Sequence, residues 1–276
     1  MFNPSNNRFN FIMTFNNTLL TAALCASLSC LSPFAAATIV EFDTVMGPIQ
    51  VNLYDQTTPK TVENFLAYVS AGDYSNSIFH RSIPGFVVQG GGFIYNNSPT
   101  LDSVSANAAV INEPVYSNVR GTIAMAKLEG NANSATNQFY FNLVDNNTIG
   151  DSLALDNQNG GFTVFGQVIG DGMAVVDAMA ALPRTADFGG LPLRNYPPAD
   201  TTDFVLTDEH FVIINNIDII DAATDTAEAL NRPLTNRGKS VPTPTTPTSS
   251  GGGGHFGLFG LLMLGFAGAM RRVKGQ

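Results

Sequence analysis

The sequence predicts a mainly β domain, built as a closed antiparallel barrel or as a sandwich. Short runs of apolar, β-branched and aromatic residues recur along the middle of the 276-residue chain, and long stretches rich in Asn, Asp and Gly separate them. Only two stretches show apolar residues at helical spacing. Many short strands with few helices favour an antiparallel barrel or sandwich over a parallel sheet, which needs a crossover helix between successive strands.

Residues 38–44 and 47–54 are predicted to open the domain as a hairpin. Apolar and polar residues alternate along both runs, the period-two pattern of half-buried strands, and Met46-Gly47 supplies the turn between them. The apolar members of this alternation are Ile39, Ile49, Val51 and Leu53.

The first helix is predicted between Thr58 and Gly72. Thr58 can cap its start, Pro59 suits the first turn, and Gly72 suits the end. Four apolar side chains between them recur at helical spacing, namely Val62, Phe65, Leu66 and Val69. One amphipathic helix therefore follows the hairpin.

Five further strand-like runs and a second helix complete the domain. The runs are 78–83, 86–89, 122–126, 138–144 and 162–169. A helix over residues 173–181 then precedes a last strand over 211–220. The segment 184–209 is long for a loop and is predicted to be a surface insertion.

Charge excludes one class of partner. All 22 acidic residues, but only six of the 13 basic residues, lie between Glu41 and Glu228, so this part of the chain has a net charge of −16. Nucleic acid is therefore not an expected partner. The three histidines are scattered and the run 156–160 departs from a calcium-loop pattern, so no metal site is predicted.

The beginning of the chain predicts export. The apolar run 19–34 ends in Ala35-Ala36-Ala37, as in a secretory signal peptide over residues 1–37 that is cleaved before Thr38. Both cysteines, Cys25 and Cys30, lie inside this run, so cleavage would leave a protein without a disulfide. A lipoprotein modified at Cys30 is the alternative, although Ser27 stands where such signals favour leucine.

The end of the chain predicts a linker and a membrane-directed tail. Residues 222–254 become rich in Pro, Thr, Ser and Gly and cannot bury a core. Residues 256–270 are 15 uncharged, mostly apolar residues followed by basic charge. As a helix they span about 22 Å, short of a ~30 Å hydrocarbon core, which makes a marginal transmembrane helix.

The tail over residues 255–276 resembles the bacterial Gly-Gly C-terminal sorting signals, which a rhomboid-type intramembrane protease cuts. This resemblance implies transient membrane contact and release to the periplasm, the cell surface or the medium. A permanent membrane anchor is the alternative.

Two sequence blocks point to a family. Residues 79–93 place Arg81 and Gln89 among apolar residues and end in a glycine run, and a second block joins 121–126 to 134–141. Together they resemble the signatures of the cyclophilins, the peptidyl-prolyl cis-trans isomerases. Over residues 38–220 the chain looks most like the exported bacterial members. The resemblance implies a closed eight-stranded antiparallel barrel capped by two helices, in a domain over residues 38–221.

The resemblance also implies an activity and a site. The expected reaction is rotation about X-Pro bonds of exported proteins, which needs no cofactor, and Arg81 is expected to stabilise the twisted amide in a water-poor site. The remaining contacts divide into two groups: Phe86, Val87, Tyr140, Leu155 and Phe162 would cradle the proline ring, and Gln89, Ala126, Lys127 and Gln138 would bind the peptide backbone. The alternative is a module that binds proline-containing segments with little turnover.

Strand alternation assigns faces to several of these residues. Gln138 and Tyr140 share one face, expected to meet the peptide, while Phe139 and Phe141 share the other and would enter the core. His80 neighbours Arg81 and would point away from the peptide. Because the reaction needs no proton transfer, His80 is predicted to have a packing role.

Overall fold

The computed structural model describes residues 38–98, 100–148, 154–184, 190–196, 206–222, 227 and 230–235. The predicted signal peptide, most of the predicted linker and the C-terminal segment lie outside these described residues. Within the described ranges, no helix has the length and apolar character needed to cross a membrane.

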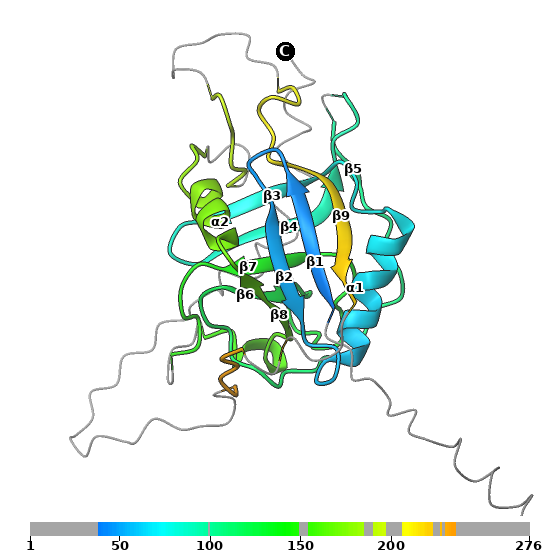
Figure 1. Cartoon of the computed structure of the whole chain (residues 1–276), viewed down its shortest axis with the longest axis vertical. Coiled ribbons are helices and arrows are strands. Elements are labelled where there is room, and N and C mark those ends of the chain that lie inside the picture. Colours follow the sequence, from blue (N-terminus) through cyan, green and yellow to red (C-terminus); the bar gives the residue numbers. More distant parts are fainter. Residues whose placement is uncertain are drawn as a thin grey trace, which may run out of the picture. The chain divides into compact units, whose positions relative to one another are not determined.

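The strands form one antiparallel sheet that closes on itself (Figure 1). The ring runs in the order β3-β9-β1-β2-β8-β6-β7-β4, and β4 pairs back to β3. The two-residue strand β5 extends the sheet beside the end of β4. The strands span Ile39–Thr44 (β1), Ile49–Leu53 (β2), Ser77–Ile83 (β3), Val87–Ile94 (β4), Asp102–Ser103 (β5), Thr122–Met125 (β6), Phe139–Asn142 (β7), Val164–Ile169 (β8) and Ile213–Asp221 (β9). The predicted closed eight-stranded barrel is confirmed.

Two α-helices lie on opposite sides of the ring in Figure 1 and close its interior: α1 (Pro59–Ala71) and α2 (Gly172–Ala180). α1 buries one face that includes Val62 and Phe65, while α2 contributes Val176 and Met179 to the same core. A short 3-10 turn, η1 (Gln158–Gly160), precedes β8.

The start of α1 is capped differently from the sequence-based expectation. Thr58 stands at the N-cap position, but its side chain makes no capping bond and donates instead to the carbonyl of Tyr54, at 3.2 Å. The carboxylate of Glu113, in a distant loop, accepts from the backbone nitrogens of Lys60 (3.3 Å) and Thr61 (2.9 Å). A tertiary contact therefore satisfies the exposed helix donors. Gly72 ends the helix in the left-handed conformation, with φ 73°, as predicted.

Aromatic side chains fill the barrel interior. The Phe42 ring lies 5.4 Å from that of Phe139 and 5.6 Å from that of Phe141, both edge-on. Phe139 and Phe141 are therefore core residues, as strand alternation predicts. Phe65 of α1 and Phe165 of β8 join them, with ring centroids 5.2 Å apart.

The described part of the 184–209 insertion contributes to packing and does not lie only on the surface. Leu191 and Leu193 are fully buried in a small apolar cluster with Ile78 and Phe211. Leu193 also pairs with Phe211 through an isolated β-bridge. These buried apolar side chains hold the described residues 190–196 against the barrel.

Residues of the predicted linker also contact the barrel. Leu234 pairs with Tyr116, and the guanidinium of Arg232 lies 5.6 Å from the Tyr54 ring centroid and 5.4 Å from that of Tyr116. Ala227 is buried. Packed structure thus continues past the end of β9.

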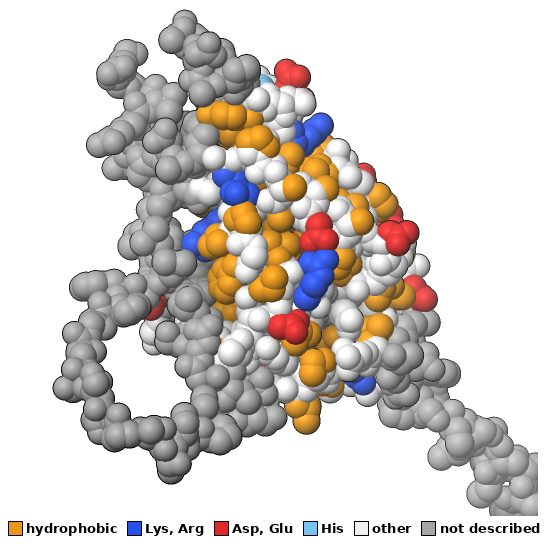
Figure 2. All heavy atoms as spheres, turned by 90° about the vertical axis from the view of Figure 1, so that its left-hand side faces the viewer, with side chains coloured by type: hydrophobic (Ala, Val, Ile, Leu, Met, Phe, Trp, Pro, Cys, Tyr) orange, Lys and Arg blue, Asp and Glu red, His pale blue; other side chains and the backbone are white. Residues whose placement is uncertain are grey.

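Charged side chains are dispersed on the face drawn in Figure 2. Acidic and basic groups stand singly or in small pairs among apolar side chains there. The described side chains drawn there form no continuous basic patch of the kind that binds a phosphate backbone.

Candidate active site

One row of side chains crosses four neighbouring strands. Arg81 of β3 lies opposite Gln89 of β4, and Gln89 lies opposite Tyr140 of β7. Tyr140 in turn lies opposite Ala124 of β6. Directly opposed residues of antiparallel strands project to the same face. Since Phe139, the chain neighbour of Tyr140, enters the barrel interior, the row lies on the outer face.

An apolar cluster surrounds one end of this row. It gathers six of the residues expected at the site, and we call these six the outer cluster: Phe86, Val87, Ala126, Tyr140, Leu155 and Phe162. Phe86 and Ala126 are only partly buried, whereas the other four are buried. The Tyr140 and Phe162 rings meet edge-on at 6.1 Å. The cluster therefore offers apolar surface at its rim and is separate from the barrel core.

Arg81 lies at the other end of the row and carries a hydrogen-bond donor that has no acceptor among the described residues. Its Nη1 atom is inaccessible to solvent and has no hydrogen-bond partner among the described residues. Burial lowers the pKa of the Arg81 guanidinium from its ordinary value. In the described part of the chain the ion pairs are Lys60–Glu63 and Arg120–Asp177, so no carboxylate there neutralises Arg81. A buried charged donor without a partner is costly, and binding of an acceptor would relieve that cost.

Two glutamines lie beside Arg81. Gln89 is fully buried, and its Nε2 donates to Oε1 of Gln138 at 2.8 Å, while its own Oε1 has no hydrogen-bond partner among the described residues. Gly92 permits this arrangement, because a Cβ at that position would lie 2.9 Å from Cδ of Gln138. Arg81 and Gln89 thus present one unused donor and one unused acceptor on directly opposed strands.

Lys127 is engaged within the protein. Its buried ammonium donates to the carbonyls of Asn159 (2.8 Å) and Gly161 (2.6 Å) and lies 4.7 Å from the centroid of the Phe162 ring. The side chain therefore supports the turn that carries Phe162. The Lys127 ammonium is thus occupied by contacts within the protein.

His80 lies outside the row. Its ring is buried and packs against Phe93, with centroids 5.0 Å apart. Burial, and secondarily the charge of Arg81, lower the pKa of His80 from 6.5 to about 3. The imidazole is therefore neutral near pH 7, which agrees with the predicted packing role.

Sequence reasoning missed a set of buried polar residues behind the outer cluster: Asn118, Asn142, Asn146 and Asp156. Asn146 begins an Asn-x-Thr run that matches a glycosylation sequon, and Asp156 begins the run that departs from a calcium-loop pattern. Neither pattern predicts burial. The sequence does show many asparagines near the apolar site residues, but this density indicates buried polar support only once the fold is known.

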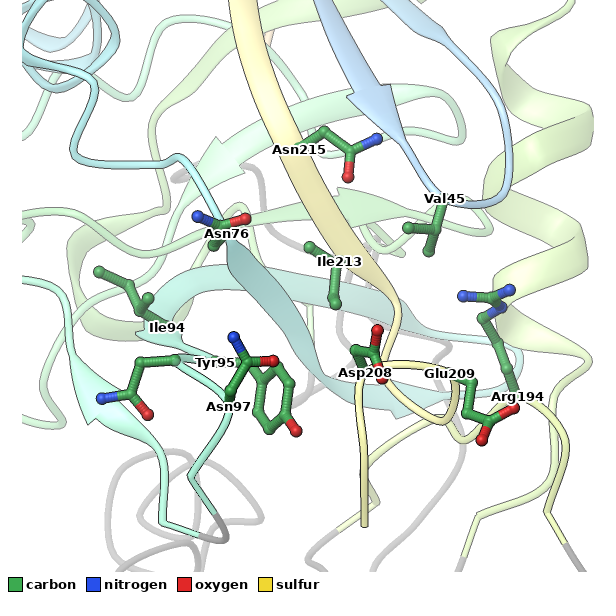
Figure 3. Close-up of a pocket in the computed structure, with 11 residues that line it drawn as sticks. Val45, Asn76, Ile94, Tyr95, Asn97, Arg194, Asp208, Glu209, Ile213 and Asn215 are labelled. Carbon is green, nitrogen blue, oxygen red and sulfur yellow. The ribbon is translucent and has the colours of Figure 1, made fainter.

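A separate cleft of about 540 Å³ lies away from these residues (Figure 3). It contains none of the expected site residues and combines side chains from the insertion with the ends of several strands. Its lining residues are Val45, Asn76, Ile94, Tyr95, Asn96, Asn97, Arg194, Asp208, Glu209, Ile213 and Asn215. Within the described ranges, His, Cys, Asp and Glu side chains form no group of three or more that could hold a metal ion.

Comparison with known proteins gives consistent matches. The model of the family described as cyclophilin type peptidyl-prolyl cis-trans isomerase/CLD matches residues 39–196. A peptidyl-prolyl cis-trans isomerase of Acinetobacter baylyi is 41% identical over 56% of this chain and 77% of its own. Peptidyl-prolyl cis-trans isomerase B of Escherichia coli is 43% identical over 50% of this chain and 82% of its own. Peptidyl-prolyl cis-trans isomerase A of Dickeya dadantii is 40% identical over 62% and 86%.

Solved structures include a more distant match. A crystal structure of a cyclophilin type peptidyl-prolyl cis-trans isomerase from Cryptosporidium parvum is 24% identical, with a TM-score of 0.46, over 67% of this chain and 98% of that one.

Proposed function

The chain belongs to the family of cyclophilin-type peptidyl-prolyl cis-trans isomerases, and from this premise we propose that it catalyses X-Pro rotation at Arg81 and the outer cluster. The observation that carries the proposal is the buried Nη1 of Arg81, which lacks a hydrogen-bond partner among the described residues. The Arg81 side chain is only partly buried, so a rotation of the guanidinium would bring this donor to a substrate that is apolar on one side and offers an amide on the other.

The chemistry requires no bond to a substrate atom. Rotation about an X-Pro bond is slow because amide resonance must be broken, at a cost of about 18–20 kcal/mol. An acceleration of ~10⁵-fold requires about 7 kcal/mol of preferential binding to the twisted state. One preorganised donor in a water-poor site supplies about 3–4 kcal/mol. Arg81 would therefore account for roughly half of the effect.

The neighbouring residues would supply the rest of the preferential binding to the twisted state. The outer cluster would receive the proline ring and exclude water, which strengthens the hydrogen bond from Arg81. Gln89 and Gln138, already linked to each other at 2.8 Å, would bind the peptide backbone beside the ring. Ala126 and the backbone of Lys127 would border the same peptide.

The test is isomerisation of a short X-Pro peptide by the purified protein. We expect acceleration that scales with enzyme concentration and falls strongly in the Arg81→Ala variant. Near-ultraviolet circular dichroism of the tyrosines reports whether each sample is folded. A folded protein that binds the peptide without accelerating its isomerisation would overturn the catalytic proposal and leave the binding module.

We also propose that the clients are exported proteins. The support is the sequence pattern of residues 1–37 and 255–276, a leader ending in Ala-x-Ala and a glycine-bounded apolar tail. Mass spectrometry of the protein from its native host tests both ends. A mature N-terminus at Thr38 and a C-terminus within 250–254 are expected. A dominant full-length C-terminus would refute tail cleavage and favour an anchor.

A further inference from the structure

Asn118 connects two walls of the outer cluster through one buried side chain. Its Oδ1 accepts a hydrogen bond from the hydroxyl of Tyr140 at 2.9 Å, and its Nδ2 donates to the carbonyl of Phe162 at 3.2 Å. Asn118 itself is fully buried. Because buried hydrogen bonds are costly to leave unmade, this side chain restrains the separation of the two aromatic residues.

Asp156 holds Asn118 in this orientation. One carboxylate oxygen accepts from the backbone nitrogen of Asn118 at 2.8 Å and from its Nδ2 at 3.2 Å. The other oxygen accepts from the hydroxyl of Ser117 at 2.6 Å. Asp156 is 1% exposed and directly follows Leu155 of the outer cluster. Bonds to an ionised acceptor are the stronger kind, so the rotamer of Asn118 is firmly set.

Two more asparagines extend the same network to the remaining walls. Asn142 donates to Oδ1 of Asn118 at 3.3 Å, and Asn146 donates to Oδ1 of Asn142 at 2.7 Å. The Asn146 side chain also donates to the carbonyl of Phe86 at 3.1 Å, and its backbone carbonyl accepts from the nitrogen of Leu155 at 2.7 Å.

The walls joined in this way come from separate parts of the chain. Tyr140 lies on β7, but Phe86, Leu155 and Phe162 lie in connecting segments outside the strands. Loop side chains are held less precisely than strand side chains unless other groups restrain them. The network supplies that restraint to all three.

We propose that Asn118 is a positioning residue: through this network it fixes the spacing of the outer cluster and thereby sets the size of the imino acid ring that the enzyme accepts. The inference rests on the proposed function, because it takes the outer cluster as the site of the proline ring. A rigid apolar site rejects one extra methylene by about tenfold or more. A site with relaxed walls loses part of that discrimination.

The experiment compares two peptides that differ only in ring size, one with proline and one with its six-membered homologue, pipecolic acid. The readout is the ratio of the two kcat/KM values. Asn118→Ala should lower this ratio by about fivefold. Asn146→Ala, which removes the bonds to Phe86 and Asn142 but leaves those of Asn118 to Tyr140 and Phe162, should lower it by about twofold. Asn64→Ala is the matched control, since among the described residues the amide of this buried side chain on α1 bonds only to the carbonyl of Thr136, at 2.7 Å.

Global destabilisation would lower both kcat/KM values together and leave their ratio unchanged. A folded Asn118→Ala protein with the wild-type ratio therefore overturns the proposal. If that variant does not fold, Asn146→Ala decides in the same way. An equal loss of selectivity in Asn64→Ala overturns the proposal as well. Wild-type protein that neither binds nor isomerises either peptide overturns the proposed function, which distinguishes that failure from failure of the network alone.

Discussion

Replacing Arg81 with alanine should lower kcat/KM by about 10²-fold, and by at least about tenfold, while leaving the barrel folded. The magnitude follows from the environment of the guanidinium: Nη1 is buried and makes no hydrogen bond to a described residue. One such donor contributes about 2.7–4 kcal/mol to a transition state, which is roughly 10²- to 10³-fold in rate. We take the lower end because Arg81 is only partly buried.

Stability should change little in the same variant. Nη1 has no protein partner among the described residues, so its removal leaves no acceptor unsatisfied there. We expect the free energy of unfolding to stay within about 1 kcal/mol of the wild type. Urea unfolding followed by circular dichroism measures it.

The conservative variant separates charge from geometry. Arg81→Lys keeps a positive charge but loses the planar fork that places two donors together, so it should recover little activity. The assay is isomerisation of an X-Pro peptide under conditions where the uncatalysed rate is subtracted. Wild-type kcat/KM in both variants would refute the role given to Arg81.

Three further predictions concern residues around the site. His80 is neutral in the folded protein, where its pKa is about 3 against an ordinary value of 6.5. Between these values it takes up a proton only on unfolding, so the free energy of unfolding should fall as the pH drops below about 6.5. Urea unfolding of His80→Gln should show a shallower fall, by up to about 1.4 kcal/mol per pH unit, and equal slopes would contradict the argument. Lys127→Met should reduce the free energy of unfolding by about 1–3 kcal/mol, because the half-buried carbonyl of Asn159 loses its donor and the buried carbonyl of Gly161 keeps only that of Asn112, at 2.7 Å; an unchanged urea midpoint would show that the ammonium contributes nothing net. Gly92→Ala should lower kcat/KM about fivefold, since the new Cβ would lie 2.9 Å from Gln138 and break its bond to Gln89. A kinetic assay at fixed peptide concentration tests it, and wild-type turnover would argue against a role for that glutamine pair.

Local patterns in the sequence are enough to predict most of the barrel. The opening hairpin, both helices and the last strand follow from apolar periodicity and from residues that start or end helices, such as Pro59 and Gly72. Strand alternation also separates Tyr140 from Phe139 correctly. Strand β4 is longer than predicted because it continues through the run Gly90-Gly91-Gly92. Glycine normally weakens strands, but here a Cβ on Gly91 would lie 2.7 Å from the carbonyl of Asn137.

Features built from distant parts of the chain could not be predicted in the same way. The carboxylate of Glu113 caps α1 across 52 positions of sequence, and Asn118 meets Asp156 across 38. No local period links such partners. A buried asparagine and an exposed loop asparagine look alike in sequence, so the polar support of the outer cluster becomes visible only in three dimensions.

Closure of the ring has a consequence for an enzyme whose substrates are proline-containing polypeptide segments. Unpaired backbone at a sheet edge is a template on which another extended chain can add as a strand, which leads to aggregation. In the eight-stranded ring each strand pairs on both sides, and the only terminal strand of the described sheet is β5, which has two residues. A client segment therefore finds little free edge to join and must engage through its side chains. Closure of the sheet therefore forms the core and also limits the addition of substrate segments as extra strands.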